Sequence, residues 1–185
     1  METTLPTFET NRLILREVTL ADVPSYQSHF ADYDVIQYLS ANVPWPYPEN
    51  GAETYLTQLV IPNQGKTRWN WGIFLKSNPT ELIGAVELFV PGLPEHRGFW
   101  LAKKYWNKGY MTEALKPVTE FAFNTLNLDK LIFANAVQNN RSRRVKEKSG
   151  AKYLDTRPAK YVNPKFTLSE FWELSRSNWE SGHSV

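Results

Sequence analysis

The chain has 185 residues, of which 42% are hydrophobic and 14% aromatic, and it predicts a single domain over residues 1–185 with a sizeable core. The absence of cysteine excludes disulfides, zinc–thiolate sites and a cysteine nucleophile. A net charge of +2 and a pI near 8.7 are too mild to favour nucleic acid as the main ligand.

The first half of the chain predicts a strand, short helices and a strand pair. Residues 12–18 alternate apolar and polar side chains, as a half-buried strand does. Thr19 is the expected N-cap of the next helix, with Asp22 as its capping partner. In chain order the predicted elements are a strand at 12–18, helices at 19–31 and 34–39, a proline-rich loop at 42–50, a helix at 49–60, and strands at 69–75 and 82–90 joined by a turn at 77–80.

The second half alternates strands and helices. The segment 111–126 has the clearest helical periodicity, with Ala114, Val118 and Phe121 on one face. The predicted elements are a loop at 91–96, a strand at 97–101, a helix at 111–126, a strand at 131–137, a helix at 142–149 ended by Gly150, and strands at 151–155 and 171–175. This alternation with short connections indicates an α/β or α+β domain around a mixed sheet.

Membrane segments, targeting signals and metal sites are not expected. Residues 1–10 carry no basic start followed by an apolar stretch, and no window approaches the roughly 18 apolar residues of a membrane span. The histidines His29, His96 and His183 lie far apart in the sequence, without the spacing of metal ligands. We therefore expect a cytoplasmic protein that needs no metal.

The stretch YWNKGYMTEA, Tyr105–Ala114, runs from an apolar strand into the helical pattern at 111–126. Gly109 can take a positive φ at no steric cost, and Asn107 tolerates the left-handed region better than most residues. Such a turn directs successive backbone N–H groups at one spot, and the helix N-terminus adds partial positive charge. The stretch therefore suits a pyrophosphate, although an ordinary strand-to-helix turn has the same composition.

A second motif, NNRSRRVKEKSG at residues 139–150, has the spacing N-x-x-S-x-x-V-x-E-K-x-G. Together with the first motif it resembles the signatures of GNAT-superfamily acetyltransferases, and specifically the RimJ/RimL type. The segments TNRLILREVTLADV (10–23) and ELIGAVEL (81–88) resemble the first strand and helix and the third strand of that family. The resemblance covers roughly residues 10–180 in the family's order.

The resemblance implies an α+β fold of three layers, with a central mixed, mostly antiparallel sheet flanked by helices. It also implies an N-acetyltransferase that uses acetyl-CoA as co-substrate and forms no covalent intermediate. The acceptor would be a primary amine, either the N-terminal amine of a ribosomal protein or a small amine, and the protein a monomer or homodimer. Two other functions stay open: an acyl-CoA sensor of the same fold without turnover, and an ATP-binding module, which the missing P-loop Lys-Ser/Thr pair disfavours.

The resemblance assigns the binding of acetyl-CoA to backbone groups of a splayed strand and of the loop after it. The amide of Leu101 would polarise the thioester carbonyl, and Thr112 would add a hydroxyl. Trp106 and Met111 depart from the family's Q/R-x-x-G-x-G/A pattern. Lys108 would pair with phosphate or stay solvated. The implied cofactor-binding residues are Phe99, Trp100, Leu101, Trp106, Asn107, Lys108, Gly109, Tyr110, Met111, Thr112, Asn139 and Ser142.

Three residues are candidates for the general base that removes the proton of the acceptor ammonium. Relatives often carry Glu where this chain has His96, and an ordinary histidine pKa of about 6.5 suits proton transfer near neutral pH. The other reading of His96 is a surface loop histidine. Glu87 is the rival, with a solvent-facing strand carboxylate as its structural alternative, and Glu95 is the third candidate.

The acid that protonates the departing thiolate is assigned by resemblance to Ser142. Many superfamily members carry a tyrosine late in the second-motif helix, where this chain has Lys146. Ser142 would bond the sulfur or the amine, or else cap the helix, and Asn139 would hold the pantetheine or turn the chain. A basic helix face suits the adenosine phosphate or is simply solvated; it consists of Arg143, Arg144 and Lys148.

Aromatic residues of the first half are expected to line the amine's side of the site or to pack in the core. The candidates are Trp45, Tyr47, Trp69 and Trp71.

Overall fold

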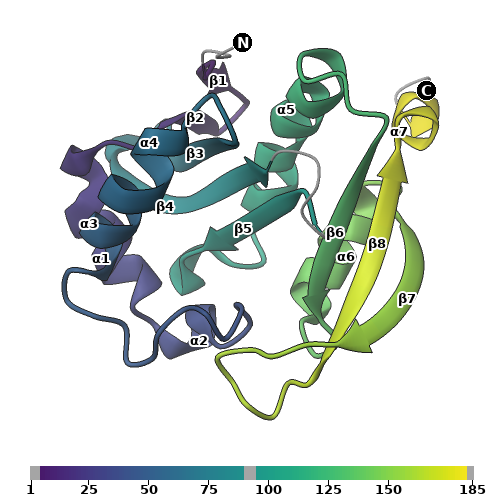
Figure 1. The fold of residues 1–185 in the computed structure, drawn as a ribbon. Helices are drawn as coiled ribbons and strands as arrows, with labels where there is room; N and C mark the ends of the chain where they lie inside the picture. The colour runs from purple at the N-terminus through teal and green to yellow at the C-terminus, as the bar shows by residue number, and fades with distance from the viewer. Residues whose placement is uncertain (1–4, 90–94, 183–185) are drawn as a thin grey trace.

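Two antiparallel sheets organise the chain in the computed structural model, which describes residues 5–89 and 95–182 (Figure 1). The larger sheet has the order β1-β2-β3-β4-β5, with strands Phe8–Glu9, Leu13–Glu17, Arg68–Leu75, Asn78–Phe89 and Arg97–Leu101. The smaller has the order β6-β8-β7, with β6 Lys130–Ala136, β8 Leu168–Ser175 and β7 Lys152–Pro158. The predicted α+β class is confirmed.

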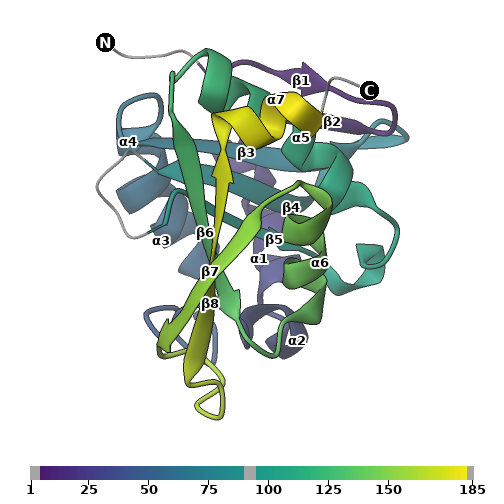
Figure 2. The ribbon, with the colours of Figure 1, turned by 90° about the vertical axis from the view of Figure 1, so that its right-hand side faces the viewer.

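Helices cover both faces of the larger sheet. The helices are α1 Val23–Phe30, α2 Tyr33–Ile36, α3 Gly51–Tyr55, α4 Ile61–Asn63, α5 Tyr110–Asn124, α6 Asn140–Lys148 and α7 Arg176–Gly182, and those that pack on the larger sheet include α1, α3 and α5, whereas α7 contacts β8. One buried cluster joins α1 and α3 to one face, where Phe30, Leu56 and Trp100 pack together. The other joins α5 to the opposite face; it includes Leu115, and Phe121 contacts Trp71. The larger sheet and its helices therefore make the three predicted layers, and in Figure 2 the smaller sheet crosses in front of them.

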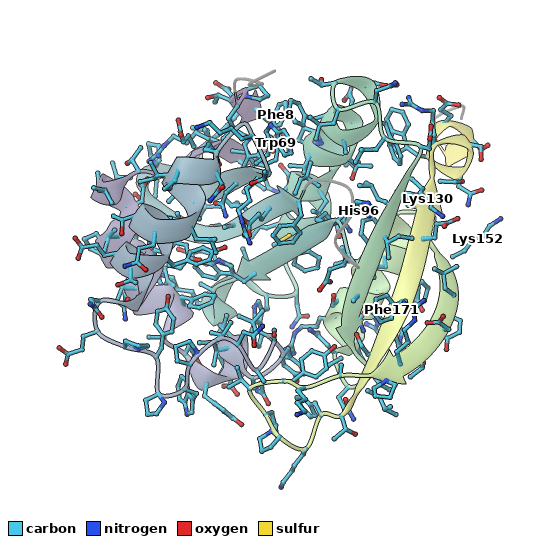
Figure 3. The ribbon with its side chains drawn as sticks, viewed as in Figure 1. Phe8, Trp69, His96, Lys130, Lys152 and Phe171 are labelled. Carbon is cyan, nitrogen blue, oxygen red and sulfur yellow. The ribbon has the colours of Figure 1, made fainter. Side chains whose placement is uncertain are left out.

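The two sheets meet at one point and diverge from it (Figure 1). The His96 amide donates to the Ile132 carbonyl at 2.8 Å, and the Ile132 amide donates to His96 Nδ1 at 2.9 Å. Figure 3 places the labelled His96 between the start of β5 and β6. Beyond this contact the strands belong to separate sheets, so among the residues that the structure describes the far part of β5 has no partner strand on its β6 side. This is the splay that the resemblance implies.

A strap of chain connects the diverging sheets at their far end. It consists of residues 37–41, after α2, paired with residues 159–163, between β7 and β8. Its backbone bonds are Ala41 N–H to Lys160 O at 3.0 Å, Val162 N–H to Leu39 O at 2.9 Å and Asn163 N–H to Gln37 O at 3.2 Å. The space between β5 and β6 is therefore bounded by backbone at both ends.

Most predicted elements are confirmed, and the differences have local causes. The capping box of Thr19 and Asp22 forms, with a first 3-10 turn at Leu20–Asp22. The turn predicted at 77–80 lies instead at 76–77, because β4 already begins at Asn78 and shifts its register by bulges near Phe74. The predicted end of the helix at residue 60 is also wrong, since a π-helical turn, Leu56–Val60, continues into α4.

At the ends of the chain, β1 and α7 have no counterpart among the predicted elements. The second-motif helix begins at Asn140 because Asn139 caps it. Part of the predicted strand end and loop, residues 90–94, lies outside the described residues. In the part of the chain that the structure describes, no helix is long and apolar enough to cross a bilayer.

Candidate active site

The loop between β5 and α5 has the conformation expected for an anion site. Asn107 and Gly109 both lie in the left-handed region, with φ of 61° and 78°. Gly109 is the N-cap residue of α5 and provides no side-chain cap, so the first N–H groups of this 15-residue helix are left for an external acceptor. Because these N–H groups carry the positive end of the helix dipole, the loop is suited to a phosphate.

Two charged residues, Arg12 and Glu113, hold the loop between β5 and α5 in place by hydrogen bonds. Arg12 on the chain before β2 donates from Nη1 to the Lys108 carbonyl at 2.9 Å and from Nε to Glu113 Oε2 at 2.7 Å. Glu113 in the first turn of α5 also accepts from Thr10 Oγ1 at 2.6 Å. Neither Arg12 nor Glu113 was a predicted site residue, because nothing in the sequence indicates that positions about 100 residues apart meet.

The free edge of β5 follows from the pairing of β5 with β4. The Phe89 amide donates to His96 O and the Ala102 amide to Ile83 O, both at 2.8 Å. Alternate residues of an antiparallel strand bond to the partner, so the even-numbered residues of β5 face β4. The amides of Phe99 and Leu101 therefore point away from β4, toward the gap. The Leu101 carbonyl accepts from Trp106 Nε1 at 2.7 Å, which leaves its amide as the free donor.

A cleft of about 1460 Å³ fills the gap between the two sheets. Most of the predicted site residues line it, namely Glu87, Phe99, Trp100, Leu101, Trp106, Asn107, Gly109, Tyr110, Met111, Thr112, Asn139 and Ser142. Among the described residues, the lining does not include the predicted His96 or Lys108. Lys108 is exposed, and its Nζ lies 5.7 Å from the centre of the Tyr105 ring.

Glu87 is a buried carboxylate on the cleft wall, so the solvent-facing alternative is wrong. It is 7% exposed, forms an ion pair with Arg68 and accepts from the Tyr55 hydroxyl at 2.9 Å. Burial raises the pKa of Glu87, and the charge of Arg68 opposes this rise. The neighbouring Asn70 is 2% exposed, lines the cleft, and its Oδ1 has no hydrogen-bond partner among the described residues.

His96 and Glu95 are both held against β6. The Nδ1 atom of His96 is occupied by the Ile132 amide, and burial lowers the pKa of the imidazole, as does the charge of Lys130. Glu95 lines the cleft, and burial raises its pKa, while the charge of Lys146 and a hydrogen bond from the Ala134 amide oppose the rise. Of the three candidate bases, Glu87 and Glu95 face the cleft and His96 does not line it.

The second motif forms the N-terminal part of α6. Asn139 is the N-cap, and its Oδ1 accepts from the Ser142 amide at 3.2 Å. The capping alternative for Ser142 is therefore wrong, since Asn139 caps the helix. Ser142 is 7% exposed and its Oγ accepts from Lys146 Nζ at 3.0 Å.

Basic residues of α6 are divided between the cleft and the sheet. Arg141, Arg144 and Lys148 line the cleft, and the guanidinium of Arg141 lies 3.8 Å from the centre of the Trp106 ring. The predicted Arg143 instead forms an ion pair with Glu170 and donates to the Val137 carbonyl at 3.1 Å. Arg143 therefore belongs to the packing of α6 against the smaller sheet.

Aromatic rings form the wall of the cleft on the side of α1 and α3. Trp100 lies 4.9 Å from Tyr26 and 5.0 Å from Phe30, measured between ring centres. Tyr47 and Tyr55 also line this wall. Of the four predicted aromatic residues only Tyr47 lines the cleft, because Trp69 and Trp71 pack in the core under α5 and Trp45 packs at a tilt against Tyr33 at the surface. Strand alternation alone does not tell which face of β3 carries the cleft.

A free strand edge that runs into a loop with left-handed residues and a helix N-terminus, beside a cleft, is an arrangement suited to a long, phosphate-bearing molecule. The model of the acetyltransferase (GNAT) domain matches residues 12–152. The chain therefore belongs to the GNAT acetyltransferase family and is an acetyltransferase.

Individual relatives agree with the family. The uncharacterized N-acetyltransferase YnaD of Bacillus subtilis is 28% identical over 144 residues, which cover 76% of this chain and 79% of YnaD. The structure of a GNAT-family acetyltransferase from Bacillus anthracis is 22% identical, with a TM-score of 0.76 over 93% of this chain and 99% of that one. RimL, a ribosomal alpha-N-protein acetyltransferase solved with coenzyme A, is 16% identical, with a TM-score of 0.75 over 92% and 97%.

Proposed function

We propose that this protein transfers the acetyl group of acetyl-CoA to a primary amine by direct attack within the cleft. The observation that carries the proposal is the continuity of donors from the free edge of β5 through the left-handed loop to the N-terminus of α5. The amides of Phe99 and Leu101 suit the pantetheine arm and the thioester carbonyl, and those of residues 107–112 suit the pyrophosphate, whereas the Trp106 amide already donates to the Lys103 carbonyl. Asn139 and Ser142 line the same cleft from α6.

Glu87 is the base in this proposal. It lies on the cleft wall beside Asn70 and Tyr55, where the free Oδ1 of Asn70 suits an N–H of the incoming amine. Its raised pKa makes the Glu87 carboxylate a stronger base. The pKa of Glu87 is then closer to that of the ammonium that loses the proton, which favours proton transfer. Glu95 is the second candidate, and His96, whose Nδ1 is occupied, is the third.

The proposed acceptor is the N-terminal amine of a protein. RimL has this acceptor class in its name, and the aromatic wall with a carboxylate behind it suits an amine on a slender, partly apolar chain. Thiol release should be measured with a panel of peptides and of small amines. If only small amines are acetylated, the acceptor is a small amine and not the N-terminal amine of a protein. Acetyl-CoA binding without turnover of any amine would make the protein a sensor.

The adenosine phosphate should lie near the exposed basic side of α6. We expect Arg144→Gln combined with Lys148→Gln to weaken acetyl-CoA binding about 3- to 30-fold, because each of the two exposed charge pairs contributes about 0.3–1 kcal/mol. Titration calorimetry with acetyl-CoA and with its 3′-dephospho form measures this. The two proteins should bind the dephospho form equally. An equal loss for both donors would contradict the placement.

No metal is required in the proposed reaction. The described residues contain no group of three or more His, Asp or Glu side chains placed to hold a metal ion. We expect the acetylation rate to stay unchanged after prolonged dialysis against EDTA. Loss of the activity that a divalent cation then restores would contradict this expectation.

A further inference from the structure

Lys146 is a buried lysine in the wall of the cleft. It is 1% exposed and lies one helical turn after Ser142 on α6. Its Nζ donates to three oxygens: Ala134 O at 2.9 Å, Asn135 Oδ1 at 2.6 Å and Ser142 Oγ at 3.0 Å. An ammonium has three hydrogens and no lone pair, so these acceptors match the protonated form.

The charges around Lys146 are nearly balanced. Glu95 from the chain before β5 and Glu170 from β8 favour the ammonium, while Arg97 of β5 opposes it. Glu170 is itself paired with Arg143. Burial, followed by the charge of Arg97, lowers the pKa of Lys146 well below the ordinary lysine value. Lys146 therefore gives up a proton more readily than a surface lysine does.

The bond from Lys146 sets the direction of the Ser142 hydroxyl. Because Nζ donates to Ser142 Oγ, the hydroxyl hydrogen points elsewhere. Within the described part of the chain this hydrogen has no acceptor, although Ser142 is 7% exposed and lines the cleft. The hydroxyl is thus left as a donor toward whatever occupies the cleft.

We propose that Lys146 supplies, through the Ser142 hydroxyl, the proton taken up by the departing thiolate of CoA. This rests on the proposed function. The acceptor nitrogen forms the bond to the acetyl carbon, and the C–S bond breaks with its electron pair going to sulfur. The sulfur takes the Ser142 proton while Ser142 takes one from Lys146. The neutral Lys146 amine regains a proton from solvent, which receives the proton lost by the acceptor.

The relay follows from the relative acidities of its members. A hydroxyl is a far weaker acid than a thiol, so Ser142 can protonate a thiolate only if it receives another proton as it does so. A thiol has a pKa of about 8.5 and a free lysine one of about 10.4. Burial lowers the pKa of Lys146 well below the ordinary lysine value, which makes its ammonium a stronger proton donor than that of a surface lysine.

Three variants test the relay: Lys146→Met, Lys146→Gln and Ser142→Ala. Glutamine retains an N–H donor toward Ser142 but cannot release a proton at these pH values, so it separates proton supply from positioning. We expect both Lys146 variants to lower kcat about 100-fold, with the Kd for acetyl-CoA within threefold of wild type. Ser142→Ala combined with Lys146→Gln should be no slower than the slower single variant.

The pH profile gives an independent measurement. Wild-type kcat should fall with unit slope above the pKa of Lys146, and Lys146→Gln should lack this alkaline fall. Full activity of Lys146→Gln, additive losses in the double variant, or an unchanged alkaline fall would each overturn the relay. If Lys146→Met does not fold, Lys146→Gln alone decides. A wild-type protein that neither binds nor uses acetyl-CoA would instead refute the proposed function.

Discussion

Gly109→Asp should weaken acetyl-CoA binding about 100-fold, or about 2.7 kcal/mol, while the protein stays folded. The residue forms the N-cap of α5 at φ 78°, where the phosphates are proposed to lie. A side chain here carries its carboxylate into the site and replaces attraction by the helix dipole with repulsion. The fold should tolerate the change, because a Cβ would meet only Arg12 Nη2, at 3.5 Å, and Asp is among the residues that accept a positive φ.

The matched control is Gly109→Asn, which has the same size and backbone preference without the charge. It should lose clearly less affinity than the aspartate variant. Calorimetry gives both Kd values, and circular dichroism checks the fold. Wild-type affinity in a folded Gly109→Asp protein would remove the loop from the proposed site.

Glu87→Gln should lower kcat about 100-fold or more and leave the Kd for acetyl-CoA near the wild-type value. Glutamine can still accept the hydrogen bond of Tyr55, so the change removes mainly the proton acceptor. Burial raises the pKa of Glu87 above the ordinary 4.5. Because the base acts when deprotonated, log(kcat/KM) should rise with unit slope below this pKa and level off above it. At high pH the gain from the free amine and the loss from deprotonation of Lys146 oppose each other, so the acidic limb is the part that reports on Glu87.

Arg68→Gln is the control for structural damage at the same pair. It breaks the ion pair but leaves the carboxylate, so kcat above the pKa should fall much less than in Glu87→Gln. Since Arg68 lowers the pKa of Glu87, its removal should move the acidic limb of the profile to higher pH. If the acidic limb of the Arg68→Gln profile stays at the wild-type pH, a group other than Glu87 titrates in that limb.

The other two candidates complete the comparison. His96→Gln and Glu95→Gln should each affect kcat much less than Glu87→Gln does. A larger loss in His96→Gln would transfer the role to the histidine. If none of the three changes matters, the amine arrives neutral and the enzyme acts by proximity and by the Leu101 amide.

The parts of the fold that depend on neighbouring residues in the sequence could be predicted from it. The capping box at Thr19 and the strand Arg97–Leu101 were found at their observed places, because capping residues and apolar runs are local signals. The strap and the partnership of Arg12 with Glu113 were not, because each joins segments more than 100 residues apart. Only the packed sheet determines such contacts.

The candidate site was predictable as a set of positions but not as a set of roles. The two motifs indicated the loop and Ser142, and both lie at the cleft. Which carboxylate faces the cleft depends on the face of β4 that carries residue 87. Bulges in the β3–β4 pair change which side chains of the strand point to each face of the sheet, so simple alternation does not predict this face. Lys146 was recognised as a departure from the family, but its three acceptors come from β6 and α6 packed together.

The strap at residues 37–41 and 159–163 makes the cleft a ring rather than an open trench. Its own residues, among them Leu39, Ser40 and Lys160, line the passage. A closed ring admits a chain end or a slender side chain more easily than the middle of a polypeptide. The three backbone bonds of the strap would therefore favour, for the proposed reaction, an acceptor whose amine stands at the end of a chain.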